Sequence, residues 1–226
     1  MSAYSDQLIV ALDVDEAKHA LQIVDALGES VTFYKVGMQL YFAEGNAFIR
    51  ELQARKKKIF LDLKINDIPE TVAKAVGSVV KLGVQYLTLF TQPAQIKAAR
   101  AVIQERGSDL KLLNVTVLTS EASTFEMVKA RAALSLGAGA DGLICSGQET
   151  AALRTEFGKS CILVNPGIRP ATAEKNDQVR IVTPAQAIIA GATNLVVGRP
   201  ITAASHPAAA AHAILAEIES AHQNGK

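Results

Sequence analysis

Short apolar runs alternate with longer amphipathic stretches from one end of this chain to the other. Eight runs have the composition of buried strands, at residues 7–12, 33–37, 58–63, 86–90, 110–118, 142–145, 161–164 and 194–197. Helical periodicity occupies the intervals, at residues 15–27, 40–55, 69–82, 93–106, 123–136, 148–157, 184–190 and 207–221. This alternation is typical of βα units on a parallel sheet. With 226 residues, each unit has about 28, near the minimum for a strand–helix–strand step.

Eight such units favour a closed (β/α)8 barrel, the TIM barrel of the α/β class, over an open doubly wound sheet. An open dinucleotide-binding sheet would need a G-x-G-x-x-G turn after its first strand, and no such turn follows residues 7–12. A barrel of this length commonly forms one unit, so we expect a single domain over residues 1–226. In this fold the active site lies at the C-terminal ends of the strands.

Charged side chains stand at the C-terminal ends of the first three runs. On a strand, alternate side chains share a face, so Asp62 and Lys64 point the same way, and Asp67 follows three residues later in the turn. Asp13 and Lys35 lie at or near the ends of the first and second runs. Burying such charges costs desolvation that apolar packing would avoid. Their repetition at one rim therefore predicts a functional site.

Each of these residues also has an ordinary structural interpretation. Asp67 with Glu70 resembles a helix N-cap with a capping box, and Pro69 suits a first helical turn. Asp13 could equally cap a helix, and Lys35 could be a solvent-exposed residue at a strand end. Asp62 and Lys64 could form a salt bridge at the end of their strand. Only the repetition at one rim separates the two interpretations.

Hydroxyl side chains follow the fourth, fifth and sixth runs. Thr91 and Ser146 are interpreted as caps of the helices that come next. Thr119, which follows the fifth run, is compatible with either a cap or a ligand contact.

The segments after the seventh and eighth runs predict a phosphate site. Residues 165–180 form a loop longer than most βα connections, and Arg169 and Gln178 are its hydrogen-bond donors. The eighth run ends in Gly198, where a ligand can approach the backbone, followed at once by Arg199. These are the loops through which a TIM barrel repeatedly binds phosphate. The predicted ligand is a phosphorylated small molecule.

Composition excludes several other classes of protein. The formal net charge of +1 argues against binding nucleic acid or a membrane surface. The basic residues 55–58 are interpreted as a solvated loop between a helix and a strand, where their charges compensate the helix dipole. Neither a signal sequence nor a run of eighteen apolar residues occurs, so a cytoplasmic protein is expected. Cys145 and Cys161 are interpreted as buried free thiols. The four histidines are scattered, and no metal site is visible.

Several motifs in order resemble the orotidine 5'-phosphate decarboxylase family. The matching segments are Ala11-Leu12-Asp13, Tyr34-Lys35-Val36-Gly37, Leu61-Asp62-Leu63-Lys64, Asp67-Ile68-Pro69 with Thr71, Val117-Leu118-Thr119-Ser120, Pro166-Gly167-Ile168-Arg169-Pro170, Asp177-Gln178-Val179-Arg180, Thr183-Pro184, and Val196-Val197-Gly198-Arg199-Pro200-Ile201-Thr202. The resemblance implies conversion of orotidine 5'-phosphate to UMP and carbon dioxide, without a cofactor or a metal, as the last step of de novo pyrimidine synthesis.

The resemblance also implies roles for individual residues. Lys64 would protonate C6 of the pyrimidine as carbon dioxide leaves, and Asp62 would lie near the departing carboxylate. Lys35 and Asp67 would complete the alternating charges, with Asp67 and Thr71 reaching into the site of the partner subunit of a homodimer. The other implied contacts are Asp13 and Lys35 to the ribose, Thr119 and Pro166 to the base, Arg199, Gln178 and the Gly198 backbone to the phosphate, and Arg169 from a loop that closes over the site.

Two other functions are compatible with parts of the pattern. Magnesium-dependent relatives that process sugar phosphates share Asp-x-Lys-x-x-Asp, but they carry a metal-binding carboxylate on the second strand, where this chain has Lys35. A catalytically silent barrel that only binds a phosphorylated nucleotide or sugar would retain the phosphate site and lose the charges. Both features are intact here, which favours the decarboxylase.

Overall fold

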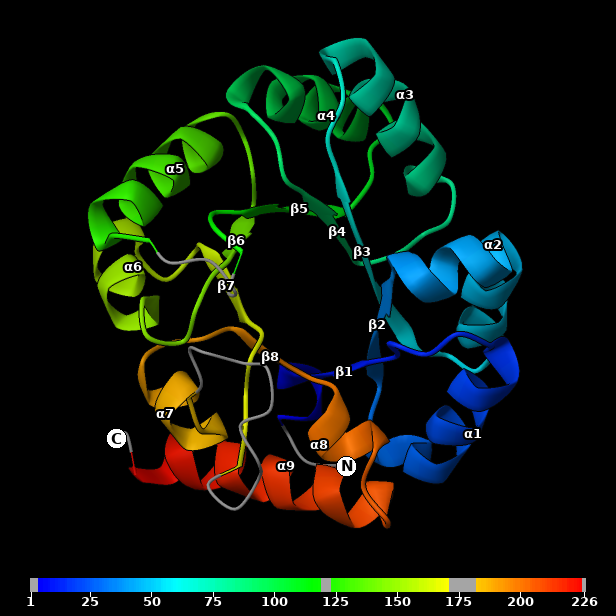
Figure 1. The fold of residues 1–226 in the computed structure, drawn as a ribbon. Coiled ribbons are helices and arrows are strands. Elements are labelled where there is room, and N and C mark those ends of the chain that lie inside the picture. Colours follow the sequence, from blue (N-terminus) through cyan, green and yellow to red (C-terminus); the bar gives the residue numbers. More distant parts are fainter. Residues whose placement is uncertain (1–3, 119–122, 171–181, 225–226) are drawn as a thin grey trace.

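The computed structural model describes residues 4–118, 123–170 and 182–224. Within these ranges, eight parallel strands follow one another in sequence order around a closed barrel (Figure 1). The strands are β1 (Leu8–Ala11), β2 (Phe33–Gly37), β3 (Lys58–Ile65), β4 (Tyr86–Leu89), β5 (Lys111–Val115), β6 (Gly142–Ile144), β7 (Ile162–Asn165) and β8 (Asn194–Val197). The expected (β/α)8 barrel is therefore confirmed.

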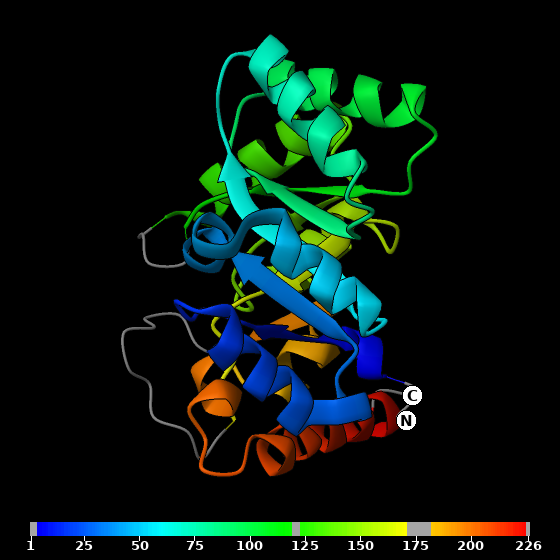
Figure 2. The ribbon, with the colours of Figure 1, turned by 90° about the vertical axis from the view of Figure 1, so that its right-hand side faces the viewer.

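Helices follow the strands and cover the outside of the barrel (Figure 2). They are α1 (Ala17–Leu27), α2 (Met38–Ala54), α3 (Pro69–Val80), α4 (Pro93–Glu105), α5 (Phe125–Gly137), α6 (Thr150–Phe157), α7 (Pro184–Ile189), α8 (Arg199–Thr202) and α9 (Pro207–Asn224), with 3-10 helices η1 (Ser5–Gln7) and η2 (Gly28–Ser30). The short helix α8 is not predicted by the sequence, because four residues are too few to show helical periodicity.

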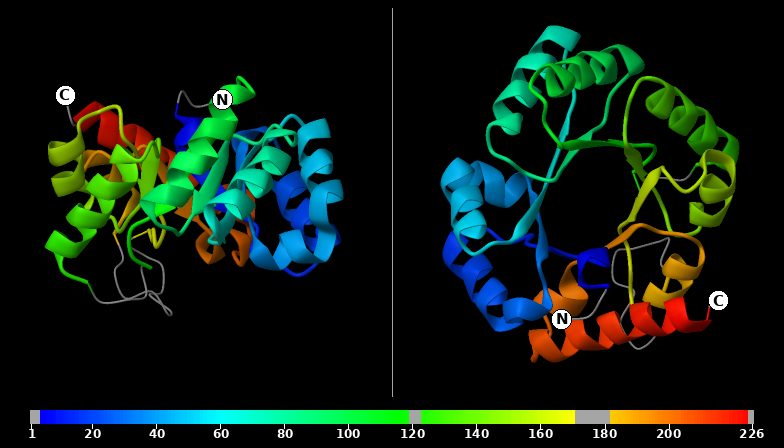
Figure 3. Two further views of the ribbon diagram at one scale, coloured as in Figure 1. Left: turned by 90° about the horizontal axis from the view of Figure 1, so that it is seen from above. Right: turned by 180° about the vertical axis from the view of Figure 1, so that it is seen from behind.

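The strands are apolar because both of their faces are buried. Side chains that point into the barrel form one cluster, made of Ile9, Ala11, Phe33, Phe60, Leu113, Val164 and Val196. Residues at the alternate positions of the strands, such as Val10 and Leu61, point outward and pack against the helices. Seen from behind, the ring of helices encloses the ring of strands (Figure 3). This inner cluster fills part of the barrel below the rim that carries the charges.

Strand β3 is irregular where it reaches that rim. Leu61 pairs with Leu87 of β4, whereas Ile65 pairs with Leu89, so four steps along β3 oppose two along β4. Lys64 lies in this stretch with a φ of 49°, in the left-handed region that side chains other than glycine rarely adopt. Bulges of this kind redirect side chains next to active sites.

The basic residues 55–58 lie between the end of α2 and the start of β3, as predicted, but the structure corrects the expectation that Lys57 is solvated. Lys57 is only 8% exposed, and its Nζ donates hydrogen bonds to the carbonyl oxygens of Gly28 at 2.7 Å and Val31 at 3.1 Å. Gly28 follows the last turn of α1, where carbonyl groups lack helical partners. The Lys57 ammonium thus satisfies backbone groups at that helix end instead of facing solvent.

The capping-box interpretation of Asp67 and Glu70 is wrong. Helix α3 begins at Pro69, as predicted for a first-turn proline, but Ile68 occupies the N-cap position and no side chain caps the helix. Glu70 pairs with Lys74 at 2.7 Å, and Asp67 Oδ1 accepts a hydrogen bond from the Ile68 N–H at 2.7 Å. Asp67 is therefore not the N-cap residue of α3.

Thr91 and Ser146 also do not cap the helices that follow them. The N-cap residues of α4 and α6 are Gln92 and Glu149. Thr91 Oγ1 donates to Asn66 Oδ1 at 2.9 Å, linking two loops at the rim, while Ser146 Oγ accepts an amide hydrogen bond inside the loop before α6.

Two further predictions concern the cysteines and the membrane. Cys145 and Cys161 are buried free thiols, as predicted. No helix in the described part of the chain is both long and apolar enough to cross a bilayer.

Candidate active site

A cavity of about 530 Å³ opens at the C-terminal ends of the strands, where this fold places active sites. Residues of β1, β2 and β3 and of the segments after β1 and β2 line one part of it, and residues of β8 and of the segments after β7 and β8 line the rest. The predicted site residues in its lining are Asp13, Lys35, Asp62, Lys64, Pro166, Arg169, Gly198 and Arg199. The closed barrel thus brings residues from opposite ends of the chain into one site.

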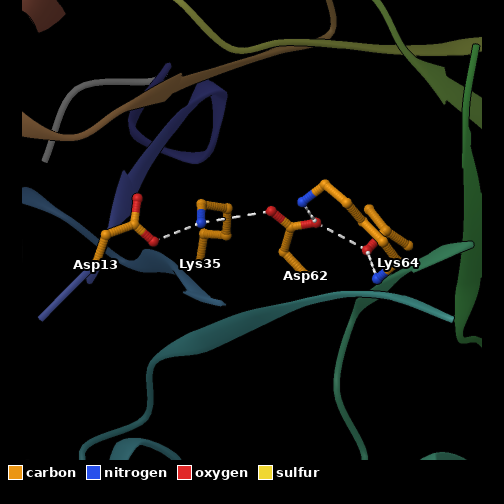
Figure 4. Close-up of polar contacts among 5 residues, drawn as sticks. Asp13, Lys35, Asp62 and Lys64 are labelled. Carbon is orange, nitrogen blue, oxygen red and sulfur yellow. Dashed lines mark hydrogen bonds and ion pairs between the residues drawn. The ribbon is translucent and has the colours of Figure 1, made fainter. Parts of the chain in front are cut away.

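Four of these residues form a row of alternating charges (Figure 4). Lys35 Nζ lies 2.8 Å from Asp13 Oδ1 and 3.4 Å from Asp62 Oδ2. Lys64 Nζ lies 2.8 Å from the other oxygen of Asp62, Oδ1. The row therefore runs Asp13, Lys35, Asp62, Lys64, and it draws on three neighbouring strands and the segments that directly follow them.

Lys35 is the most deeply buried member of the row, at 8% exposure. Burial alone would lower the pKa of its ammonium, but the carboxylates of Asp62 and Asp13 outweigh that effect and raise the pKa above the usual 10.5. Lys35 is therefore a fixed cation at neutral pH. A Cβ on Gly37 would lie 3.2 Å from Lys35 Nζ and 3.1 Å from Asp13 Oδ1, so glycine leaves room for the pair.

Asp62 is held as an anion by the groups around it. Burial alone would raise the pKa of its carboxyl, but the charges of Lys35 and Lys64, with hydrogen bonds from Lys64 and Thr88, lower it below the usual 3.8. Both oxygens of Asp62 have cationic neighbours, Lys35 at Oδ2 and Lys64 at Oδ1. The carboxylate is thus fixed in orientation as well as in charge.

Thr88 of β4 belongs to this network although the sequence analysis does not identify it. Its buried hydroxyl donates to Asp62 Oδ1 at 2.8 Å and accepts from the backbone N–H of Lys64 at 2.9 Å. The available signal is a polar residue inside an apolar strand next to the strand that carries Asp62. A threonine is common in strands, so that signal is weak on its own.

The opposite part of the cavity carries the residues predicted to bind phosphate. Arg169 is only 6% exposed, and its Nη1 donates to the Ile168 carbonyl oxygen at 2.9 Å. A parallel bridge between Ile168 and Val182 fixes the backbone beside it. Gly198 directly precedes α8, and the exposed Arg199 begins that helix. Arg169, Gly198 and Arg199 therefore line the same cavity as the charged row.

An apolar compartment of about 130 Å³ adjoins the charges. Its lining combines the polar residues Lys35, Asp62 and Lys64 with apolar ones, namely Phe60, Val115, Val117, Leu118, Ile144, Pro166 and Val196. A flat, weakly polar ring would fit such a lining, with one edge next to the Lys64 ammonium.

Two predicted site residues of the described chain, Asp67 and Thr71, do not line this cavity. Asp67 and Thr71 are exposed, Asp67 in the turn after β3 and Thr71 in the first turn of α3. Thr119 and Gln178 lie outside the described residues, so their roles stay predictions.

The charges of the site also bear on metal binding. Within the residues that the structure describes, no group of three or more His, Cys, Asp or Glu side chains could hold a metal ion. A divalent cation prefers carboxylate oxygens, and here the Lys35 ammonium already occupies the space between the carboxylates of Asp13 and Asp62.

The fold and the site define a (β/α)8-barrel enzyme with a buried row of opposite charges beside a cationic rim. The chain belongs to the orotidine 5'-phosphate decarboxylase / HUMPS family, whose model matches residues 6–214. The family resemblance found in the sequence is therefore confirmed.

Individual relatives agree with this assignment. The chain is 48% identical to an orotidine 5'-phosphate decarboxylase of Afipia carboxidovorans and 47% identical to one of Rhodopseudomonas palustris (strain HaA2), and each comparison covers 96% of both proteins. The crystal structure of orotidine 5'-phosphate decarboxylase from Lactobacillus acidophilus matches with a TM-score of 0.81 at 36% identity, over 93% of this chain and 98% of that one.

Proposed function

We propose that this protein decarboxylates orotidine 5'-phosphate to UMP and carbon dioxide without a cofactor, as the last step of de novo pyrimidine synthesis in the cytoplasm. The observation that carries the proposal is the row of charges ending on Lys64, beside an apolar compartment and in one cavity with Arg199. The relatives described above are named for this activity.

Lys64 is assigned to the chemical step. Loss of carbon dioxide from C6 leaves a localised negative charge that the pyrimidine π system cannot delocalise, so the site must stabilise or protonate that carbon. Opposite unit charges at about 4 Å interact by about 4 kcal/mol at an effective dielectric constant of about 20. Because this charge exists only as the bond breaks, the interaction is worth about three powers of ten in rate.

Asp62 is assigned to the neighbourhood of the departing carboxylate. Its pKa lies below the usual value, so it is an anion that would repel the substrate carboxylate until carbon dioxide leaves. Such ground-state destabilisation is secondary to the stabilisation by Lys64. The main task of Asp62 is to hold the Lys64 ammonium, at 2.8 Å, where the new proton is needed.

The remaining residues bind parts of the substrate that do not react. We assign the ribose hydroxyls to Asp13 and Lys35, the base to Thr119 and Pro166, and the phosphate to Gln178, Gly198 and Arg199, with Arg169 in the loop that closes over it. The phosphate is remote from C6, so its binding energy can be used to close the site and exclude water.

A homodimer would complete the charged row. We assign Asp67 and Thr71 to the site of the partner subunit, an assignment supported by their exposure and by a cavity lining that contains neither. Mixing Lys64→Ala with Asp67→Ala tests this, because each heterodimer has one site with both mutations and one with neither. Half of a random mixture is heterodimer, so about a quarter of wild-type activity returns; no recovery contradicts the shared site.

The activity is tested by incubating the chelator-treated protein with orotidine 5'-phosphate and following the loss of its ultraviolet absorbance. Turnover that persists after EDTA treatment supports the proposal. No turnover by the wild type overturns it. Turnover that EDTA abolishes and magnesium restores indicates instead the magnesium-dependent chemistry of the relatives that process sugar phosphates.

Two variants separate chemistry from phosphate binding. Lys64→Ala is expected to lose nearly all turnover while still binding UMP, measured by calorimetry. Arg199→Ala is expected to slow decarboxylation of orotidine 5'-phosphate far more than that of orotidine, which has no phosphate. Equal losses of UMP binding and turnover in both variants contradict this division of roles.

A further inference from the structure

The hydroxyl of Thr88 connects two charged residues of the site that no other described side chain connects in the same way. It accepts the backbone N–H of Lys64 at 2.9 Å and donates to Asp62 Oδ1 at 2.8 Å. The Lys64 ammonium donates to that same oxygen at 2.8 Å. Thr88 Oγ1 therefore contacts both the Lys64 backbone and Asp62 Oδ1. Asp62 Oδ1 in turn contacts the Lys64 ammonium.

The bulge in β3 explains why a side chain is needed at this place. Between the pairs Leu61–Leu87 and Ile65–Leu89, the β3 backbone runs out of step with β4. The N–H of Lys64 bonds to the Thr88 hydroxyl instead of to a strand carbonyl. An unpaired buried N–H is unfavourable, so the hydroxyl stabilises the left-handed conformation of Lys64 at φ 49°.

Thr88 lies outside the lining of the site. It is fully buried and lines neither the cavity nor the apolar compartment. Mutation of a residue that orients a metal ligand typically costs 10- to 100-fold in metal affinity or activity, and we expect a similar loss for a residue that orients a catalytic side chain. The role open to Thr88 is therefore to set the positions of Lys64 and Asp62.

We propose that Thr88 is a positioning residue, whose hydroxyl fixes the backbone of Lys64 and the carboxylate of Asp62 in the one geometry that serves the reacting carbon. The proposal rests on the proposed decarboxylation for its kinetic consequences. Its structural part, the bond from the Lys64 N–H, is independent of which reaction the protein catalyses.

The test compares Thr88→Val with Thr88→Ser. Valine keeps the shape of threonine and removes the hydroxyl, whereas serine keeps the hydroxyl and removes a methyl group. We expect Thr88→Val to lower kcat for orotidine 5'-phosphate by about 10- to 100-fold with KM changed less than about threefold, and Thr88→Ser to stay within about threefold of the wild type. Should Thr88→Val fail to fold, Thr88→Ala against Thr88→Ser makes the same comparison.

Thr116→Val is the matched control. Thr116 is also buried, and its hydroxyl donates to the Ile144 carbonyl oxygen at 3.2 Å, away from Asp62 and Lys64. The Thr116→Val variant loses one buried hydroxyl hydrogen bond without changing a contact of Asp62 or Lys64, so its kcat should stay within about threefold of the wild type. Equal losses of kcat in Thr116→Val and Thr88→Val overturn the proposal.

Hydrogen exchange at the Lys64 amide gives a readout that does not depend on activity. We expect this amide to exchange at least about tenfold faster in Thr88→Val than in the wild type, and unchanged in Thr88→Ser and Thr116→Val. If the wild type does not decarboxylate the substrate, the proposed function fails while this measurement still tests Thr88. Unchanged exchange in Thr88→Val, or faster exchange with unaltered kcat in an active enzyme, overturns the positioning role.

Discussion

Replacing Lys35 by methionine removes the central cation of the charged row and keeps a side chain of similar length. Asp62, whose side chain is 13% exposed, then has one cationic neighbour instead of two. Breaking a buried pair costs about 3–5 kcal/mol, and we expect about 3 because Lys64 still pairs with Asp62. The bond from Lys35 to Asp13 adds little, since the Asp13 side chain is 60% exposed.

Urea unfolding and thermal melting at pH 7 measure this loss. For a chain of this length, about 3 kcal/mol corresponds to a melting temperature lower by about 6–12 °C. In the wild type, the pKa of Asp62 is lower in the folded protein than its usual value of 3.8. This difference stabilises the folded state above pH 3.8, and the stabilisation is lost as the pH falls through the pKa of Asp62 in the folded protein. Without Lys35 the pKa of Asp62 rises, so the difference between the two proteins should shrink as the pH falls toward 4.

Lys58→Met is the matched control. The Lys58–Asp6 distance of 2.6 Å is shorter than the Lys35–Asp62 distance of 3.4 Å, but the side chains of Lys58 and Asp6 are 45% and 59% exposed. Its loss should stay below about 1 kcal/mol. Adding Asp62→Asn to Lys35→Met should recover part of the stability, since the buried carboxylate is removed and the Lys64 ammonium, whose side chain is 30% exposed, is still in contact with water. The reasoning is refuted if Lys35→Met costs no more than Lys58→Met, or if its cost is the same at pH 4 and pH 7.

Three further predictions concern residues away from the charged row. Arg154→Lys should lower the free energy of unfolding by about 2 kcal/mol in urea, because Nε and Nη2 both donate to the Gly191 carbonyl oxygen, at 3.0 and 2.7 Å. Gly147→Ala should lower the melting temperature, since its Cβ would lie 2.2 Å from Val182 Cγ2; an unchanged value contradicts this contact. Burial raises the pKa of Cys145 to about 12, so mass spectrometry should find it unmodified by a disulfide reagent at pH 8 until urea is added.

The fold was predictable because its strands are buried on both faces and its helices on one. The bounds of β2 and β8 agree with the sequence prediction, since an apolar run coincides there with the whole strand. The prediction failed where single residues decide the structure. In the β3 bulge the Lys64 N–H bonds to the Thr88 hydroxyl of another strand, and the buried Lys57 ammonium bonds to carbonyl groups on either side of η2.

The candidate site was predictable to the extent that its chemistry lies in charged side chains at strand ends. Asp13, Lys35, Asp62 and Lys64 stand out because each interrupts or ends an apolar run. Their pairing order could not be read from the sequence, because Asp62 bridges two lysines only through the particular register of β2 and β3. Uncharged partners carry no comparable signal, since a threonine in a strand is ordinary.

The charged row comes from the first three strands, whereas Gly198 and Arg199 follow the eighth, and pairing of β1 with β8 brings the two sets together. Lys64, to which we assign the chemical step, is therefore synthesised long before Gly198 and Arg199, to which we assign phosphate binding. A chain still lacking its last strand holds an open sheet and half of a binding site. With the roles proposed above, we expect activity only after β8 has been synthesised and has paired with β1.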